Sequence, residues 1–159
     1  MNAFKQLFRF DPKKVGMVGV ERECFLTDAD GKIIPLAKRV LEKLTDREHF
    51  GYELSACQLE SRCGPATIED IRNRLIENDA IIQEAERELD FRRLHTEVGP
   101  ADMPLDIYPD PTGRYAQITK SMPREILLAA CRVIGTHIHI GMPDHDTALH
   151  IYNEAIKSF

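Results

Sequence analysis

The chain has 159 residues and a net charge of −5 at pH 7, with 43% hydrophobic and 30% charged residues. This composition is typical of a globular protein, and the length predicts a single domain over residues 1–159. No apolar run approaches the roughly 18–20 residues of a membrane span, which excludes an integral membrane protein. The acidic balance argues against nucleic-acid binding through phosphate contacts. Because no signal-peptide pattern is present, we expect a cytoplasmic protein.

The first half of the chain alternates strand-like and helical patterns. The sequence predicts a strand at 15–26, a hairpin partner at 32–36, a helix at 37–44, a second strand at 50–63 and a long helix from 68 to about 91. Gly64 and Pro65 are expected to stop the second strand. Thr67 is expected to cap the long helix, because Asp70 follows it at the spacing of a capping box.

The second half continues the mixed pattern. It predicts a short strand at 94–98, a proline-rich loop at 99–113, a helical stretch after Pro123, a strand at 131–142 and a last helix to Ile156 that Asp144 or Asp146 caps. Strands and helices in this order favour an α+β fold, with a mainly antiparallel sheet and helices packed on one side.

Two groups of glutamates stand in the predicted strands. Glu21 and Glu23 project to one face, because side chains alternate along a strand. Glu60 lies near the end of the next long strand. Glu53 is seven residues before it, which is the wrong parity for the same face, so Glu53 needs a bulge or a loop position to join the others. A simpler interpretation of both groups is a hydrated, solvent-facing strand surface.

A third group is the pair His137 and His139, which share one face of the last predicted strand. Two hydrogen-bonded histidines are an equally plausible interpretation. Taken together, however, many carboxylates and few imidazoles favour Mg²⁺ or Mn²⁺ over zinc. A hydrolase or cupin-like oxygenase built on the two histidines is disfavoured, because Pro143 and Asp144 follow them where a cupin-type glutamate is needed. Magnesium held by carboxylates commonly serves phosphoryl transfer from a nucleotide, and the absence of a glycine-rich loop predicts a nucleotide site built on a sheet.

In their order along the chain, residues 19–26, 53–60 and 135–141 resemble the glutamate–cysteine ligase type 2 family, also called carboxylate–amine ligases. The resemblance covers residues 15–159. It implies a glutamine synthetase-like catalytic fold, in which an antiparallel sheet lines a funnel that holds metal ions and ATP. Family members are more than twice this length, so the resemblance implies the N-terminal half of the funnel. We therefore expect a homo-oligomer or pairing with a second half.

The resemblance also implies roles for individual residues. The implied metal ligands are Glu21, Glu23, Glu53, Glu60 and His139, and His137 or His139 is implied to lie near the ATP phosphates. Arg114 and Tyr115 are similar to a family Arg-Tyr pair to which no role is assigned.

The implied reaction is ATP-dependent amide formation through an acyl phosphate, with ATP and Mg²⁺ or Mn²⁺ as cofactors. Its small-molecule substrates would be glutamate or a similar carboxylate, and an amine such as cysteine. The alternative is a non-catalytic relative, or a regulatory half-domain, that binds metal or nucleotide.

Overall fold

The computed structural model describes residues 9–44 and 48–158. These residues form an α+β fold around a five-stranded sheet in which every pairing is antiparallel, as the sequence predicts. The strands are β1 (Val18–Thr27), β2 (Phe50–Tyr52), β3 (Gln58–Ala66), β4 (Arg92–Leu94) and β5 (Thr136–Ile140). The funnel that the family resemblance implies stays a prediction.

Strand β1 is the centre of the sheet. Strand β3 pairs along one of its edges, and β2 pairs with the outer edge of β3. The other edge of β1 is shared, because β5 pairs with residues 18–22 and β4 with residues 25–27. Side chains from three different strands can therefore meet on either face of β1.

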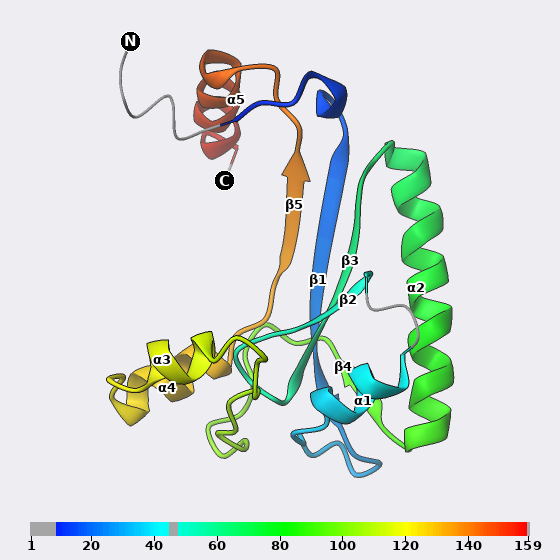
Figure 1. Ribbon diagram of the computed structural model, residues 1–159, viewed down its shortest axis with the longest axis vertical. Helices are drawn as coiled ribbons and strands as arrows, with labels where there is room; N and C mark the ends of the chain where they lie inside the picture. Colours follow the sequence, from blue (N-terminus) through cyan, green and yellow to red (C-terminus); the bar gives the residue numbers. More distant parts are fainter. Residues whose placement is uncertain (1–8, 45–47, 159) are drawn as a thin grey trace.

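The helices are α1 (Ala37–Lys43), α2 (Ile68–Leu89), α3 (Arg114–Thr119), α4 (Arg124–Cys131) and α5 (His145–Ile156), preceded by a 3₁₀ turn at Pro12–Lys14. Helix α2 runs along the sheet, α3 and α4 lie together near one end of β5, and α5 lies at the opposite end (Figure 1). Among the described residues, no helix is both long and apolar enough to cross a membrane.

Helix α2 begins where the sequence predicts. The side chain of Thr67 accepts a hydrogen bond from the backbone N–H of Asp70, which satisfies one of the free donors of the first turn. The helix ends at Asp90, whose left-handed backbone (φ 52°) stops the helical hydrogen-bond pattern. Ile71 and Ile82 are buried on the side that packs against β1 and β3. Helix α2 therefore covers one face of the sheet.

The main hydrophobic core lies where α1, α2 and the sheet meet. Its fully buried members include Leu26, Val40, Leu59, Ile82 and Phe91. Burying each such side chain contributes about 1.5–3 kcal/mol before entropy is counted. This packing holds β1 and β3 rigidly side by side, which matters because both strands carry site residues.

The predicted strand at 50–63 is wrong, because β2 and β3 are separate strands. The backbone between them bonds to the proline-rich loop instead: Ala56 donates to the carbonyl of Asp106, and Tyr108 donates to that of Leu54. These bonds replace those that a continuous strand would make with its neighbours. At its far end, β3 continues through Gly64 and Pro65 to Ala66, which the sequence did not predict, because an irregular register there restores the pairing with β1.

Four smaller differences concern element bounds. Residues 32–36 make only an isolated bridge, between Ile33 and Thr27, and β4 lies at 92–94 rather than 94–98. Of the strand predicted at 131–142, only Thr136–Ile140 forms β5, because Cys131 ends α4 and Val133 makes only an isolated bridge with Val98. Helix α3 was not predicted. It follows Gly113, whose positive φ of 70° suits the turn into the helix.

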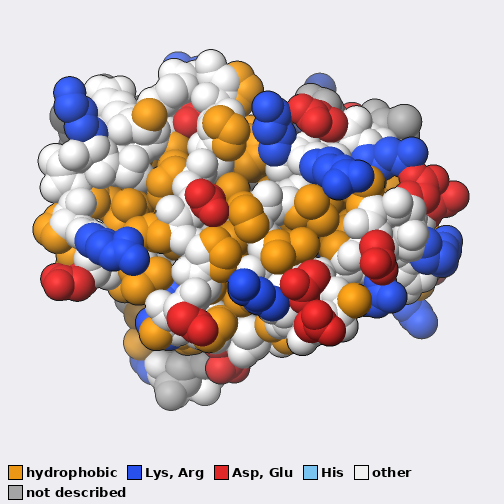
Figure 2. Space-filling model, turned by 90° about the horizontal axis from the view of Figure 1, so that it is seen from below, with side chains coloured by type: hydrophobic (Ala, Val, Ile, Leu, Met, Phe, Trp, Pro, Cys, Tyr) orange, Lys and Arg blue, Asp and Glu red, His pale blue; other side chains and the backbone are white. Residues whose placement is uncertain are grey.

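Seen from the end where α3 and α4 lie, the surface shows exposed apolar side chains separated by charges of both signs (Figure 2). Neither acidic nor basic side chains form one continuous area on this face.

Candidate metal centre

The sheet face opposite α2 gathers the acidic and histidine residues that the sequence singles out. In the register of β1, Glu21 is paired with His137 of β5, and Glu23 is paired with Glu60 of β3. Paired residues on neighbouring strands project to the same side. Gly19, which shares this face, is paired with His139. Five of the six predicted site residues therefore come together by strand register alone.

Glu53 joins the other glutamates from a loop, as its strand parity predicts. It lies in the connection between β2 and β3, directly after Tyr52. One carboxylate oxygen from each of Glu23, Glu53 and Glu60 lies within 4.8 Å of the others. We call these three residues the carboxylate cluster.

The carboxylate cluster carries more negative charge than its surroundings balance. Burial, together with the charges of Glu60 and Glu23, raises the pKa of Glu53 to about 7. Burial also raises the pKa of Glu60, whose residue surface is only 7% exposed, although the Arg62 guanidinium opposes the shift. Glu53 and Glu60 share a hydrogen bond, which requires a proton on one of them. Burial and crowding thus oppose a full set of negative charges on these carboxylates.

The geometry of the carboxylate cluster fits a hard divalent cation. Mg²⁺ and Mn²⁺ prefer oxygen ligands, and Mg²⁺–oxygen distances are about 2.0–2.1 Å, so that oxygens on opposite sides of the ion lie roughly 4 Å apart. The 4.8 Å spread of the three oxygens needs only a small side-chain adjustment to meet this distance. Glu23 is already oriented, because its Oε2 accepts a hydrogen bond of 2.8 Å from the backbone N–H of Gly135.

The two histidines bind Glu21 rather than the carboxylate cluster. His139 Nε2 lies 3.1 Å and His137 Nδ1 lies 3.3 Å from the same oxygen, Oε2 of Glu21. The hydrogen bond to His139 is the main reason that the pKa of Glu21 is lowered. His137 also approaches Glu23, at 3.9 Å from Oε1. Both imidazoles are more than half exposed. A second polar group, Glu21 with the two histidines, therefore stands beside the carboxylate cluster.

Arg62 belongs to the site and was missed by the sequence analysis. Its Nε lies 3.3 Å from Glu60 Oε1, and its Nη2 donates a hydrogen bond of 3.1 Å to the carbonyl of Phe50. Gly51 makes room for this arrangement, because a Cβ there would lie 3.0 Å from Glu60 Oε1 and 3.3 Å from Arg62 Cζ. The signal was available, since Arg62 has the same strand parity as Glu60.

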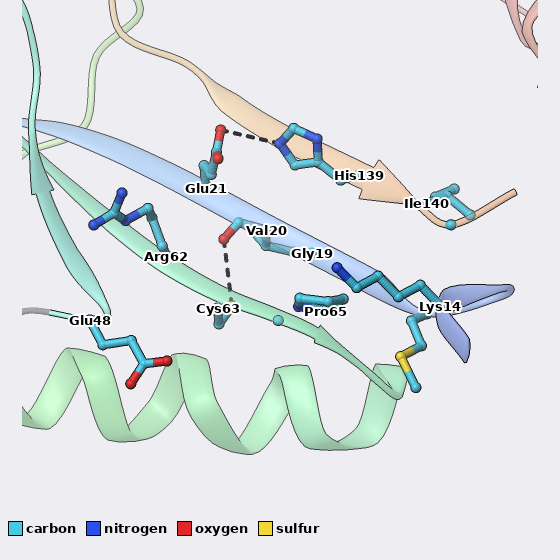
Figure 3. Close-up of a pocket in the computed structure, with 13 residues that line it drawn as sticks. Lys14, Gly19, Val20, Glu21, Glu48, Arg62, Cys63, Pro65, His139 and Ile140 are labelled. Atoms are coloured by element: carbon cyan, nitrogen blue, oxygen red, sulfur yellow. Dashed lines mark hydrogen bonds and ion pairs between the residues drawn. The ribbon is translucent and has the colours of Figure 1, made fainter. Parts of the chain in front are cut away.

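Two cavities adjoin the glutamate-bearing face. The first, about 560 Å³ in volume, includes Lys14, Glu21, Arg62 and His139 among its lining residues. In Figure 3, Arg62 and Lys14 lie toward opposite ends of this cavity, with the contact between Glu21 and His139 in the region between them. We call it the basic cavity after Lys14 and Arg62, although two carboxylates, those of Glu21 and Glu48, line it as well.

The second cavity, about 520 Å³, shares Glu21 and Arg62 with the first. Glu53, Glu60 and three tyrosines, Tyr52, Tyr108 and Tyr115, are among its lining residues, and we call it the tyrosine cavity. Burial and the nearby charge of Glu53 raise the pKa of Tyr115 to about 12, so this phenol stays protonated. Arg114, the other member of the Arg-Tyr pair, is not among the lining residues of either cavity.

Comparisons with known proteins find relatives whose names agree with the family resemblance. Two proteins from Mycobacterium sp., strains KMS and JLS, are each 28% identical to the chain over 139 residues and are provisionally named glutamate–cysteine ligase 2-2. A protein of Rhodococcus jostii (strain RHA1), provisionally named glutamate–cysteine ligase 2-3, is 26% identical over 143 residues. The chain is similar to glutamate–cysteine ligases.

The similarity covers most of this chain but a minor part of its relatives. It spans 86% of the chain and 37% of each Mycobacterium protein, and 89% of the chain and 17% of the Rhodococcus protein. No family profile matches the chain, and no solved structure shows a significant match. The activity of a complete ligase therefore enters as a proposal.

Proposed function

We propose that the chain carries the metal- and ATP-binding part of an ATP-dependent carboxylate–amine ligase of the glutamate–cysteine ligase type. Such a ligase transfers the γ-phosphoryl group of ATP to a carboxylate, and an amine then attacks the acyl phosphate to form an amide. The observation that carries the proposal is the carboxylate cluster, whose three oxygens lie within 4.8 Å of one another on a sheet face crowded with acidic groups.

In this proposal Glu23, Glu53 and Glu60 hold Mg²⁺ or Mn²⁺. The bound cation would neutralise charge on phosphoryl oxygens, which is the main requirement of phosphoryl transfer. Glu21 is held by His137 and His139, so that its carboxylate keeps one orientation beside the cluster. Both histidines are more than half exposed, and His139 lines the basic cavity, where it would be available to a nucleotide.

The basic cavity is the proposed position of the ATP phosphates. Lys14 and Arg62 bring two positive charges to its walls beside the carboxylates of Glu21 and Glu48, and a guanidinium binds phosphate oxygens through parallel N–H groups. A divalent cation would offset these carboxylates next to a phosphate. Arg62 also lies against Glu60 of the carboxylate cluster. It therefore connects the proposed metal ligands with the proposed phosphate position, as a ligase site requires.

The names of the relatives suggest glutamate as the carboxylate and cysteine as the amine. Because the chain spans only 37% of the Mycobacterium proteins, we propose that a second half or a second copy of the chain completes the catalytic site. ATP and metal binding need only the residues described above and should therefore be measurable on the chain as it stands.

The decisive experiment is calorimetric titration of ATP into the chain with Mg²⁺, and again with EDTA. We expect binding that requires Mg²⁺ and that weakens at least tenfold in Glu23→Gln. The glutamine keeps a carbonyl to accept the Gly135 hydrogen bond but cannot supply a charged ligand. The matched control is Glu84→Gln on the exposed side of α2, which should bind as the wild type does. Absence of Mg²⁺-dependent binding in the wild type would contradict the proposal.

Product analysis separates the ligase from the non-catalytic alternative. The chain is incubated with ATP, Mg²⁺, glutamate and cysteine, and ADP is measured. ADP release that requires glutamate supports the ligase. Tight binding of Mg²⁺ and ATP without ADP release, at any protein concentration, favours a regulatory or degenerate relative.

A further inference from the structure

Strand β5 has one edge with which no described strand pairs. Its other edge pairs with β1, and every residue of β5 is exposed. Proteins usually protect a free strand edge with charged side chains, proline, a bulge or a very short strand. Strand β4 carries Arg92 and Arg93, and β2 has only three residues. Strand β5, in contrast, contains no Lys, Arg, Asp, Glu or Pro, and its register with β1 has no bulge. Its free edge can therefore accept another strand.

The hydrogen bonds at the two ends of β5 show which of its backbone groups point to the free edge. Before the strand, the N–H of Glu23 donates to the carbonyl of Gly135 at 3.0 Å, and after it the N–H of Gly141 donates to the carbonyl of Met17 at 2.9 Å. Hydrogen-bonded and non-hydrogen-bonded pairs alternate in an antiparallel ladder. The odd-numbered residues of β5 therefore direct their N–H and C=O groups to β1. The free edge presents the backbone groups of the even-numbered residues, Thr136, Ile138 and Ile140.

This edge is complementary to itself. When a second copy of the chain approaches in the antiparallel direction, with a two-fold axis at Ile138, the two Ile138 residues lie opposite each other and Thr136 lies opposite Ile140. These are the residues whose N–H and C=O groups face the free edge, so each group meets a donor or an acceptor of the other copy. The side chains match as well. Ile138 and Ile140 are 67% and 54% exposed and would pack on those of the second copy, and no Lys, Arg, Asp or Glu of β5 meets a like charge.

Helix α5 adds apolar surface that a short strand cannot provide. Stable interfaces bury about 1,200–2,000 Å² in total. No residue of α5 is buried, and Leu149, Tyr152 and Ile156 recur at helical spacing on one side of the helix, with exposed fractions of 60%, 62% and 54%. A helix of 12 residues is only marginally stable without packing, so this apolar face requires a cover. In Figure 1, α5 extends past β5 on the side of the free edge, where the second copy would lie.

We propose that the free edge of β5 and the apolar face of α5 form an interface with a second copy of the chain, paired antiparallel about Ile138. The two sheets then form one continuous sheet, with both glutamate-bearing faces on the same side. In this register His137 of each copy lies opposite His139 of the other, so the second copy brings two imidazoles to the glutamate-bearing face of the first. That the second copy thereby completes the candidate site rests on the proposed function. The interface itself requires neither metal nor ATP.

Sedimentation equilibrium in buffer with EDTA tests whether the chain pairs with itself. We expect the mass to rise with concentration from 18.2 kDa toward twice that value. The dissociation constant should be about 1–100 µM, at the weak end of the range that interfaces of ordinary size span. If a separate second half covers this surface in place of a second copy, the chain stays monomeric. A monomer at concentrations up to about 1 mM would therefore overturn the proposal.

Substitutions of Ile138 test the position of the interface. Ile138→Lys places two like charges side by side at the two-fold axis and should raise the dissociation constant at least tenfold. Ile138→Pro removes an N–H that faces the free edge but no hydrogen bond to β1, as an edge strand permits, and should have the same effect. Ile76→Lys, at a 60% exposed isoleucine of α2, is the matched control and should dimerise as the wild type does. Circular dichroism checks that each variant folds. Folded Ile138 variants that dimerise with the wild-type constant would show that another surface is used, and the proposal would be wrong.

Hydrogen exchange tests the interface without any substitution. The amides of Thr136, Ile138 and Ile140 face the free edge, so they should exchange at least tenfold more slowly at concentrations where the chain is dimeric than where it is monomeric. The amides of His137 and His139, which the strand alternation directs to β1, are the internal control and should change much less. A dimer in which the three outward amides exchange as fast as in the monomer would overturn the proposal.

These outcomes are distinguishable from those that test the proposed function. A dimer formed through β5, together with failed Mg²⁺-dependent ATP binding, would contradict the ligase and leave the interface in place. Normal ATP binding by a chain that stays monomeric would contradict the interface alone.

Discussion

The two faces of the central sheet differ in how far their charged side chains are paired. On the α2 face, Arg22 and Arg93 each lie 2.6 Å from Asp79 Oδ1, and Arg93 also lies 3.1 Å from Glu86. The pKa of Asp79 is lowered by these arginines in spite of its partial burial. Two arginines are paired with two carboxylates, so the charges of this network are balanced without a ligand.

The glutamate-bearing face is not balanced in this way. Its carboxylate cluster has Arg62 as a neighbouring cation, and the pKa of Glu53 rises to about 7. Successive residues of β1 point to alternate faces, so one strand contributes both to the balanced ion-pair network and to the crowded carboxylates. The comparison indicates that the charges on the α2 face stabilise the fold, whereas the crowded carboxylates on the other face cost stability, which is consistent with the proposed cation site.

The largest expected effect comes from breaking the balanced face. Arg93→Ala should lower the free energy of unfolding by about 2–3 kcal/mol, because it removes the guanidinium from the half-buried Glu86 and leaves Asp79 with Arg22 alone. Urea denaturation measures the change. Arg72→Ala, on the exposed side of α2, is the matched control and should change stability by less than about 0.5 kcal/mol. Equal effects of the two variants would show that the ion-pair network stabilises nothing.

A somewhat smaller loss is expected for Asn78→Ala. The Nδ2 of this buried residue donates 3.1 Å hydrogen bonds to Ser61 Oγ and to the carbonyl of Arg62. Leaving these acceptors without a partner should cost about 1–2 kcal/mol in the free energy of unfolding. Asn73→Ala, exposed on the same helix, serves as the control in the same urea series. A loss no larger than that of the control would mean that water replaces the amide.

On the glutamate-bearing face, a substitution is expected to raise the free energy of unfolding and not to lower it. In EDTA and at about pH 8, Glu53→Gln should raise the free energy of unfolding by about 1 kcal/mol, because it removes one of three crowded carboxylates. The same substitution should weaken Mn²⁺ binding at least tenfold, as measured by the electron paramagnetic resonance of free Mn²⁺. Glu84→Gln should change neither quantity. A Glu53→Gln variant that is less stable than the wild type would contradict the trade-off.

Strand periodicity was enough to predict much of this site. It placed Glu21 with Glu23, and His137 with His139, on common faces, and the register of β1 then brings them together. The antiparallel α+β class and the capped helix α2 also followed from local patterns, because burial repeats and caps are properties of neighbouring residues.

Long-range contacts set the limit of that analysis. The break between β2 and β3 depends on backbone bonds from the proline-rich loop, some 50 residues further along, and no local pattern contains it. The position of Tyr115 depends on the unpredicted helix α3 and on its ring contact with Tyr52. Arg62 could have been assigned to the site from the sequence, because its strand parity matches that of Glu60. Its contact with the site, however, depends on the close approach of Gly51 from the neighbouring strand, which only the structure shows.

The smallest expected effect is a difference in pH dependence between the two faces. The pKa of Glu53 in the folded chain, about 7, lies above its ordinary value of 4.5, so the folded state holds a proton that the unfolded state loses in this interval. The contribution of Glu53 to stability is therefore complete below about pH 4.5 and is lost as the pH rises through 7. Asp79, with its lowered pKa, has the opposite sign: its contribution is present above its ordinary value of 3.8 and is lost as the pH falls through its folded pKa.

Urea denaturation in EDTA across pH 5–8 distinguishes the contribution of Glu53 to stability from that of Asp79. The advantage of Glu53→Gln over the wild type should shrink from about 1 kcal/mol near pH 8 toward zero near pH 5, because the wild-type carboxyl then carries a proton and resembles the amide. The loss caused by Asp79→Asn should stay constant over the same range, since Asp79 is ionised throughout it. If the gain in stability of Glu53→Gln were independent of pH, its cause would be relief of steric crowding and not of repulsion between carboxylates. The electrostatic argument for a cation at the carboxylate cluster would then be contradicted.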